Sequence, residues 1–339
     1  MQSAIVIVNP ISPNLPSHRH LREAASWLRS QGWQTDWALT RSPGDATVVA
    51  ARAAQEGRSL VVVCGGDGTI NEAVNGLAGS ETALAVIPAG TANVWAKEIG
   101  VPRQPVAALE VAIRGQARRM DLGLASPSSG EGGRYFFMMA GLGLDGSIAA
   151  ALPLNVKRYL GATTYAIMAV GQSLRYRGQR VKLVVDDEPL EASLLMMVVG
   201  NTRGYAGITQ VTSRAYVDDG LLDVCVFQGR HTLDIIFHTL RVAAQAHLRA
   251  SPVLYRRARR LEVHSERPLP AQLDGDFYPG YPTVFQAVPA ALTVMVPRKS
   301  LPLFRHRKPQ PWLAGSLPPP GTTSRSSGRP LRSDPAPWP

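Results

Sequence analysis

The N-terminal third of the chain alternates short apolar runs with segments in which apolar residues recur at helical spacing. Each apolar run ends in a polar or glycine-rich turn, which is typical of buried strands. We expect strands over residues 4–8, 34–39, 60–63 and 83–87. We expect helices over residues 19–29, 45–54, 70–77, 94–99 and 105–113. Strands that alternate with helices predict an α/β domain with a parallel sheet.

The pattern changes near Met120, after which strands dominate. They are expected over residues 135–140, 180–185, 192–199, 221–227, 261–265, 283–288 and 292–296. Helical periodicity interrupts them at residues 162–174 and 232–248. This succession predicts an antiparallel, β-sandwich-like or barrel-like domain with inserted helices.

Three regions follow from these patterns. Residues 1–122 form the predicted α/β domain, and residues 123–300 form the β-rich domain. Residues 301–339 are rich in proline and basic side chains, and we expect a disordered tail there.

Two glycine-rich turns follow neighbouring strands of the predicted parallel sheet. The first runs from Gly65 to Thr69 and the second from Pro88 to Asn93. Right-handed crossovers bring such turns to the same edge of the sheet, where backbone N–H groups at helix N-termini bind anions. Asn9 and Thr40 end the first two strands at this edge. Each polar residue alone is a common turn or cap residue, but the set favours a phosphate site.

The phosphate loop has neither of the two common sequence patterns. The Gly-x4-Gly-Lys-Ser/Thr pattern of P-loops is missing, and so is the Gly-x-Gly-x-x-Gly spacing of dinucleotide sites. Asp67 lies inside the loop, where a carboxylate should repel phosphate unless it binds a metal or handles a proton. This residue therefore indicates a catalytic loop.

Charge and cysteine content narrow the classes of partner and compartment. The net charge is +11 and the sequence pI is about 10.1, which favours acidic partners such as nucleotides, nucleic acid or an anionic membrane. Nucleic acid is disfavoured because aromatic residues make up only 6% of the chain and show no stacking pattern. Two cysteines argue against a disulfide framework. With no signal peptide or spanning segment recognised, we expect a cytoplasmic protein with peripheral contact at the inner membrane face.

The loop sequence identifies a family resemblance. Gly-Gly-Asp-Gly-Thr followed by Asn71-Glu72, with Gly-Thr-Ala-Asn downstream, resembles the diacylglycerol kinase and sphingosine kinase superfamily and its bacterial soluble lipid kinase branch. The resemblance covers the chain to about residue 300. It implies an ATP-binding α/β domain, a β-rich lipid-binding domain and an active site in the cleft between them. ATP would be the co-substrate and Mg²⁺ the metal.

Carried over position by position, the resemblance assigns nucleotide contacts. They are Asn9, Thr40, Gly65, Gly66, Asp67, Gly68, Thr69, Ile70, Asn71, Glu72, Gly90, Thr91 and Asn93. Two positions depart from the family pattern, because Val94 stands where many members have Asp and Pro13 where many have Gly.

The resemblance also assigns a metal site and the catalytic carboxylates. Asp219 would bind Mg²⁺ with the main-chain carbonyls of Tyr216 and Leu221, although Asp-Asp-Gly read alone is a hairpin turn. Asp276 would accept the proton of the lipid hydroxyl, one methylene shorter than the family's Glu, and Asp274 would support it. Asp67 would orient Mg-ATP or assist proton transfer.

The expected function is ATP-dependent phosphorylation of a lipid hydroxyl, on diacylglycerol or a sphingoid base. Candidates for the acyl lining, although such residues are more often simply core, are Phe136, Phe137, Met138, Met139, Ile167 and Met168. An NAD kinase and a non-catalytic lipid-binding or regulatory protein stay open as alternatives, and so does a homodimer. Arginines at 256, 257, 259 and 260, after a helix with Arg241 and Arg249, predict either a contact with anionic lipid or a solvated face, and both interpretations stay open.

Overall fold

The computed structural model describes residues 2–129, 132–151, 176–205, 209–249, 251–298 and 303–305. Its first lobe holds four parallel strands in the order β4-β3-β1-β2, as the alternating pattern predicted. These strands are β1 (Ser3–Val8), β2 (Gln34–Leu39), β3 (Leu60–Gly65) and β4 (Ala83–Pro88). All residues of β3 and β4 are buried, because helices cover both faces of the sheet.

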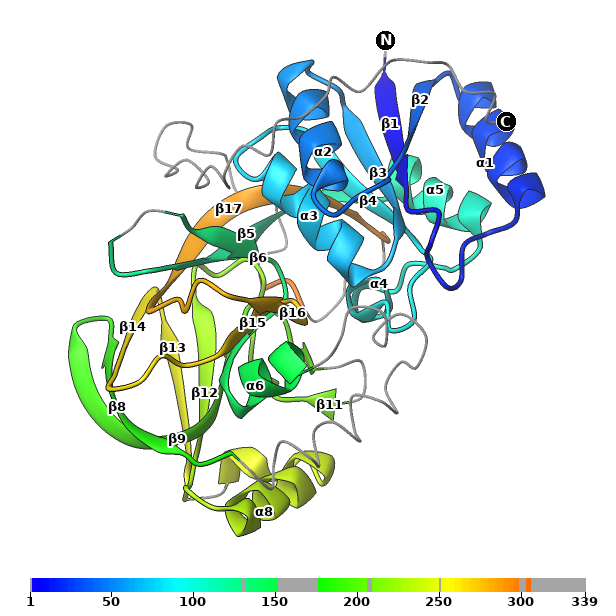
Figure 1. Ribbon diagram of the computed structural model, residues 1–339. Helices are drawn as coiled ribbons and strands as arrows, with labels where there is room; N and C mark the ends of the chain where they lie inside the picture. The colour runs from blue at the N-terminus through cyan, green and yellow to red at the C-terminus, as the bar shows by residue number, and fades with distance from the viewer. Residues whose placement is uncertain are drawn as a thin grey trace.

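Five helices pack on this sheet. They are α1 (His18–Ser30), α2 (Asp45–Gln55), α3 (Asp67–Leu77), α4 (Val94–Ile99) and α5 (Pro105–Arg114). Helices α2 and α3 pack together, and so do α1 and α5. Figure 1 shows the two pairs on opposite faces of the sheet.

The second lobe is mainly antiparallel. Its main strands are β6 (Arg134–Phe136), β7 (Met139–Gly143), β8 (Gln179–Val185), β9 (Glu188–Gly200), β12 (Leu222–Gln228), β13 (Val253–Ala258), β14 (Arg260–Ser265), β15 (Ala271–Leu273) and β16 (Asp276–Tyr278). A short pair, β10 (Gly204–Tyr205) and β11 (Thr209–Gln210), forms a separate sheet. Helices α6 (Leu144–Ala151) and α8 (Thr232–Ala243) and the 3-10 turn η1 (His247–Arg249) complete the described part of this lobe.

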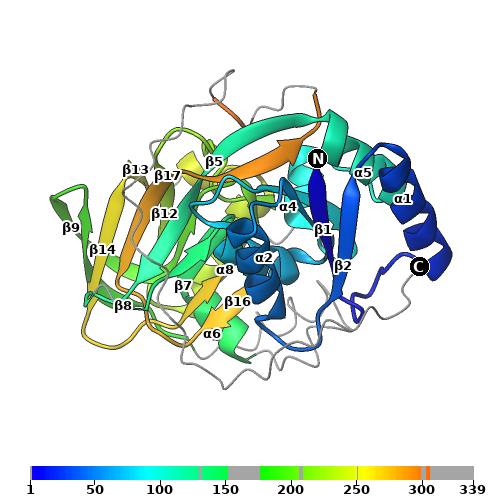
Figure 2. The same cartoon turned by 90° about the horizontal axis from the view of Figure 1, so that it is seen from above.

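Two long strands join the lobes. Strand β5 (Gln116–Ser126) pairs with β17 (Val284–Val296) in an antiparallel ladder, and β17 also pairs in parallel with β4. Figure 2 shows both strands running from the second lobe into the first. The two lobes are therefore joined by continuous β-structure.

The structure differs from the expected pattern in identifiable places. Residues 135–140 form two strands, because the N–H groups of Phe137 and Met138 donate to a buried carboxylate of Asp274. The two strands expected over 283–288 and 292–296 are one strand, β17, with a register shift after Val288. Strands β5, β13, β15 and β16 were not predicted.

Some expectations fall outside the described residues. These include the helix over 162–174, with Ile167 and Met168, and all of the tail except 303–305. Leu303 is buried in the core of the first lobe, and its carbonyl accepts from Val217 N at 3.1 Å. No helix among the residues that the structure describes is long and apolar enough to cross a membrane.

Candidate active site

The two glycine turns touch each other at the carboxyl edge of the parallel sheet. A β-carbon at Gly90 would lie 2.5 Å from the Gly66 Cα, a distance that excludes any side chain there. Asn93 closes the second turn in a left-handed conformation (φ 48°). Its Oδ1 accepts from Gly90 N at 2.8 Å, and its Nδ2 donates to Gly90 O at 2.7 Å. The glycines thus let two backbone segments meet where a phosphate could reach both.

Asp67 joins the first turn to the second. Its Oδ2 accepts from Val94 N at 3.0 Å and its Oδ1 from Trp95 N at 3.3 Å. Burial raises the pKa of Asp67, and these two hydrogen bonds oppose that rise. The carboxylate is therefore engaged at the start of α4, where negative charge is favourable. This contact accounts for an acid within a phosphate loop, and a direct role toward Mg-ATP stays a prediction.

The first turn opens α3 without a side-chain cap. Gly66 is the N-cap residue, so the first N–H groups of α3 have no capping side chain from it. Such a helix start binds anions well. Thr69 lies in this first turn, and its Oγ1 accepts from Asn9 Nδ2 at 2.9 Å. Asn9 and Thr69 were both predicted to lie at this edge, and here they are in contact.

The remaining predicted nucleotide contacts lie around the same edge. Thr40 follows β2, and its N–H donates to Val8 O at 3.0 Å. Thr91 is exposed in the second turn, while Ile70 is buried in α3 and belongs to the core. Asn14, which the sequence patterns did not single out, holds the second turn from β1's side, since its Nδ2 donates to Gly90 O at 2.7 Å.

Asn71 and Glu72 fasten α3 to its surroundings. Asn71 is fully buried; its Oδ1 accepts from Arg134 Nη2 at 2.6 Å and its Nδ2 donates to Asp274 Oδ2. Glu72 accepts from Ala46 N at 3.3 Å and so ties α3 to the start of α2. Burial raises the pKa of Glu72, and the nearby Asp276 adds to that rise, while Arg134 opposes it.

Asp274 is a buried carboxylate of the second lobe that contacts helix α3 of the first lobe. Its carboxylate accepts from Phe137 N, Met138 N and Met139 N at 2.8–2.9 Å, in addition to Asn71. Complete burial raises the pKa of Asp274 to about 6, against the lowering effect of these bonds. The residue also has a positive φ of 49° and precedes Gly275 at 86°, which makes a tight hairpin turn between β15 and β16.

This hairpin carries Asp276 to the phosphate loop. Asp276 pairs with Leu273 in the register, and a β-carbon built at Gly68 would lie 3.4 Å from its Oδ2. A second set of bonds supports the turn: Gln272 Oε1 accepts from Gly275 N at 2.5 Å, and Gln272 Nε2 donates to Asp145 at 2.9 Å. The fold therefore brings together Gly68 and Asp276, which lie far apart in the sequence.

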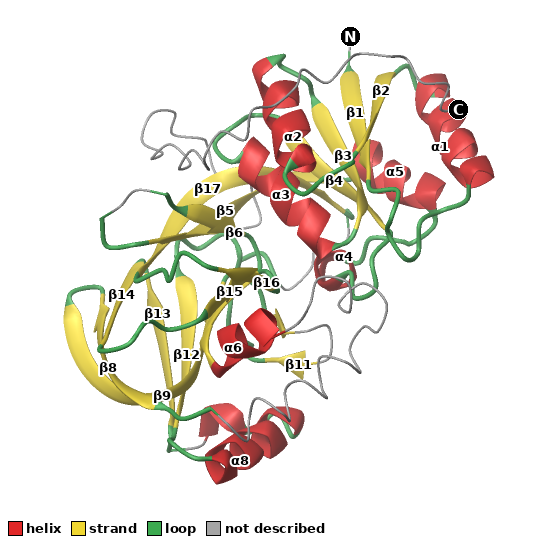
Figure 3. Cartoon of the chain, in the orientation of Figure 1, coloured by secondary structure: helices red, strands yellow, loops and turns green. Residues whose placement is uncertain are grey.

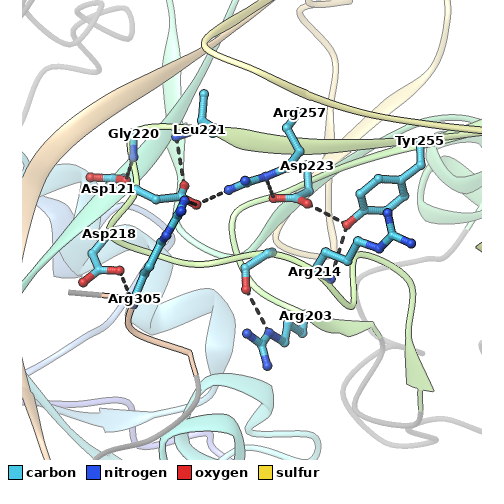
Figure 4. A network of polar contacts seen from close by, with 12 residues as sticks. Asp121, Arg203, Arg214, Asp218, Gly220, Leu221, Asp223, Tyr255, Arg257 and Arg305 are labelled. Carbon is cyan, nitrogen blue, oxygen red and sulfur yellow. Dashed lines mark hydrogen bonds and ion pairs between the residues drawn. The ribbon is translucent and has the colours of Figure 1, made fainter. Parts of the chain in front are cut away.

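A second carboxylate network surrounds the predicted metal ligand. Asp219 Oδ1 accepts from Leu221 N at 3.2 Å, and its Oδ2 forms an ion pair with Arg257. Arg305 Nη1 lies 3.8 Å from the same oxygen. Figure 4 shows Arg257 reaching toward Asp223, whose Oδ2 lies 3.6 Å from its Nε.

Buried acids around this network repel one another. The pKa of Asp121 is raised to about 6, chiefly by burial and also by the neighbouring Asp219 and Asp218. The pKa of Asp223 is likewise raised to about 6, chiefly by burial, although Tyr255 donates to it at 2.6 Å. Asp121 accepts from Gly220 N at 2.6 Å and from Ala290 N at 2.8 Å, so it holds the Asp-Gly turn against β17.

In the arrangement that the structure shows, the predicted ligands Asp219, Tyr216 and Leu221 do not fit a Mg²⁺ site. Both oxygens of Asp219 already accept from protein donors, and the Arg257 guanidinium supplies the positive charge beside its carboxylate. The ring of Tyr216 lies under Arg203, with 4.9 Å to the guanidinium carbon. Within the described ranges, no group of three His, Cys, Asp or Glu residues could hold a metal. The metal role of Asp219, Tyr216 and Leu221 stays a prediction.

The expected acyl lining is placed in the core. Phe136, Phe137, Met138 and Met139 are all buried and belong to three different hydrophobic clusters. Phe137 packs edge-on against Trp95 of α4, with 5.8 Å between ring centroids, and so ties α4 to the second lobe.

Arg134 and Asp121 were missed by sequence reasoning. Arg134 follows a polar loop and Asp121 lies within β5, and neither position carries a periodic or motif signal. Only their contacts across more than 60 residues reveal them.

Two family models match this chain. Residues 3–125 match the diacylglycerol kinase catalytic domain, and residues 139–296 match the YegS C-terminal NAD kinase β-sandwich-like domain. A protein of Chromohalobacter salexigens named "Probable lipid kinase YegS-like" is 33% identical over 308 residues, which cover 87% of this chain and 93% of the relative. The diacylglycerol kinase of Bacillus subtilis is 28% identical over 306 residues, 88% of this chain and 98% of the relative.

A solved structure shows the same fold. A diacylglycerol kinase of Bacillus anthracis superposes with a TM-score of 0.69 at 23% identity, covering 87% of this chain and 97% of that chain. The family models and the relatives confirm the resemblance predicted from the loop sequence. The α/β and β-sandwich-like fold class is confirmed as well. Lipid kinase is favoured over the two alternatives, NAD kinase and a non-catalytic protein.

Proposed function

The chain belongs to the diacylglycerol kinase family and is a lipid kinase, and from this premise we propose that it transfers the γ-phosphoryl group of ATP to a lipid hydroxyl. The proposal assigns ATP to residues 1–122 and the lipid to residues 123–300. The preferred acceptor is diacylglycerol, which several relatives carry in their names, and a sphingoid base is the second candidate.

The contact between Gly68 and Asp276 carries the proposal. One residue belongs to the helix start at the phosphate loop and the other is a carboxylate from the opposite lobe, and a β-carbon built at Gly68 would lie 3.4 Å from Asp276 Oδ2. A hydroxyl held at Asp276 would therefore face a phosphate held at the loop. Such positioning is the main requirement of phosphoryl transfer.

The step needs one proton acceptor. The lipid hydroxyl oxygen forms a bond to the γ-phosphorus while the bond from that phosphorus to the β,γ-bridging oxygen breaks, and ADP leaves. The hydroxyl proton passes to the carboxylate of Asp276. The first N–H groups of α3 and the meeting of the two glycine turns would stabilise the phosphate charge. Mg²⁺ would arrive with ATP and supply charge neutralisation on the phosphates.

Other residues position the pair formed by Gly68 and Asp276. Asp274 fixes the hairpin by its four hydrogen bonds, and Arg134 holds Asn71 beside it. Arg134 also places a positive charge beside Glu72 and Asp274. Without that charge, the buried Asp274 and the partly buried Glu72 would add repulsion against the incoming phosphate.

The experiment measures phosphate transfer from labelled ATP to diacylglycerol, sphingosine or NAD in parallel. Asp276→Asn should lower kcat for the lipid by at least about 100-fold, because the amide cannot accept the proton. Glu188→Gln, at an exposed acid in the same lobe, is the matched control and should match wild type. An Asp276→Asn enzyme with wild-type turnover would overturn the base assignment, and phosphorylation of NAD alone would overturn the acceptor class.

A further inference from the structure

Helix α8 exposes an apolar stripe. Leu233, Ile236, Phe237 and Leu240 are 78%, 52%, 40% and 66% exposed, and their spacing puts all four on one face of the helix. Eight large hydrophobic side chains are exposed in the described residues, and half of them lie here. Isolated exposed apolar residues are ordinary, but a contiguous stripe marks an interaction surface. We call these four residues the α8 stripe.

The other face of α8 packs against the second lobe. His238 is buried, its Nε2 lies 2.7 Å from Gln228 O, and its ring packs edge-on against Phe227. Val242 packs on the same small core. The helix is thus fixed in rotation, and its stripe points away from the lobe that holds it. Figure 3 shows α8 at the end of the second lobe farthest from the α/β lobe.

Basic residues border the stripe. The guanidinium carbon of Arg241 lies 4.8 Å from the ring centroid of Phe237, and Arg230 is exposed just before the helix. The one acid of α8, Asp234, accepts from Arg230 N and His231 N, and these bonds lower its pKa. No further acid follows until Glu262. The surface is therefore apolar with a positive border.

We propose that α8 is an interfacial docking helix that inserts the α8 stripe into an anionic lipid bilayer, with Arg230 and Arg241 in the headgroup layer. Amphipathic helices with this distribution lie in the plane of the interface, and each basic residue near an anionic surface adds attraction. The proposal deepens the proposed function, because a lipid acceptor lies in such a bilayer.

A second copy of the chain fits this surface less well. A two-fold interface across α8 would bring Arg230 and Arg241 of both copies together, with no acid after Asp234 to balance them. The arginine cluster at 256–260 also fits less well than α8 as the main contact. Arg257 is committed to Asp219, and Arg260 pairs with Glu262 at 3.0 Å.

Vesicle binding by the full chain tests the proposal. Sedimentation with phosphatidylglycerol–phosphatidylcholine vesicles compares wild type with the double variant Leu233→Ser/Leu240→Ser. These two side chains are the most exposed of the stripe, so the fold should survive their replacement. Partition should weaken about tenfold or more. Val48→Ser, at a 58% exposed residue of α2, is the matched control and should bind like wild type.

Two further measurements test the role of the basic residues and the oligomeric state. Arg230→Gln and Arg241→Gln should each weaken binding to anionic vesicles about fivefold, with little effect on neutral vesicles. Unchanged sedimentation of the stripe variant would overturn the proposal. A wild-type dimer that the stripe variant dissociates, with vesicle binding intact, would overturn it in favour of a second copy.

Activity separates this proposal from the proposed function. The stripe variant should keep turnover on a short-chain diacylglycerol dissolved as monomers and lose it on vesicle-borne acceptor. Wild type that binds vesicles through α8 but phosphorylates no lipid would refute the proposed function alone. Equal losses on both acceptors would refute the docking role.

Discussion

Asn71 donates a hydrogen bond from Nδ2 to Oδ2 of Asp274, a residue 203 positions later in the chain. The contact joins the helix that follows the phosphate loop to the hairpin that carries Asp276. Because both side chains are buried, this hydrogen bond between the lobes is not weakened by solvent. The stability of the protein and the proposed catalysis therefore both depend on the contact between Asn71 and Asp274.

Replacing Asp274 by Asn should destabilise the protein in a pH-dependent way. The pKa of Asp274 is about 6 in the folded protein and 3.8 in the reference state, so the folded state binds the extra proton between these values. The wild type accordingly loses stability as pH rises through this window, whereas Asn does not titrate.

The destabilisation caused by Asp274→Asn should thus be about 2 kcal/mol larger at pH 4.5 than at pH 7. Urea unfolding of both proteins at the two pH values measures it. A destabilisation by Asp274→Asn that is larger at pH 7 than at pH 4.5 would contradict the raised pKa of Asp274. The exposed control Asp187→Asn should show no such trend.

Sequence patterns predicted the parallel sheet and the two turns because these depend on local periodicity and glycine. They also placed Asp276 opposite the loop through family resemblance. They could not predict why Asp67 is present, because its partners, Val94 and Trp95, are backbone amides in the next turn. Likewise, the contacts of Arg134 and Arg257 arise from side chains that meet only in the folded chain.

Asp67→Asn should weaken ATP binding more than turnover. An amide has one acceptor oxygen, so one of the bonds to Val94 N and Trp95 N is lost and the second turn loosens. We expect about 0.5–2 kcal/mol lower stability and a several-fold higher KM for ATP. Steady-state kinetics and thermal melting measure both. A loss of more than 100-fold in kcat with unchanged KM and melting temperature would instead favour direct chemistry by Asp67.

Two glycine-to-alanine changes in the loops should separate folding from catalysis. Gly90→Ala puts a methyl group 2.5 Å from Gly66 Cα, so the turns must move apart and the melting temperature should fall. Gly68→Ala puts one at ordinary contact distance, 3.4 Å, from Asp276 Oδ2. It should leave the melting temperature near wild type and lower kcat, because the methyl group lies between loop and base. Full activity of Gly68→Ala would show that the reacting groups meet elsewhere.

Removing Arg257 should create a Mg²⁺-dependent protein. Asp219 and Asp223 are buried, and both lose a cationic partner in Arg257→Gln, which should cost about 3–5 kcal/mol. Mg²⁺ offers the charge that the guanidinium supplied, so millimolar Mg²⁺ should recover part of the loss in this variant and shift wild type little. Arg256→Gln, at the exposed neighbouring position, is the control and should behave like wild type. Thermal melting with and without Mg²⁺, in the absence of ATP, measures the effect. A wild-type protein that Mg²⁺ stabilises by several degrees, with no added effect in Arg257→Gln, would favour Asp219 as a metal ligand.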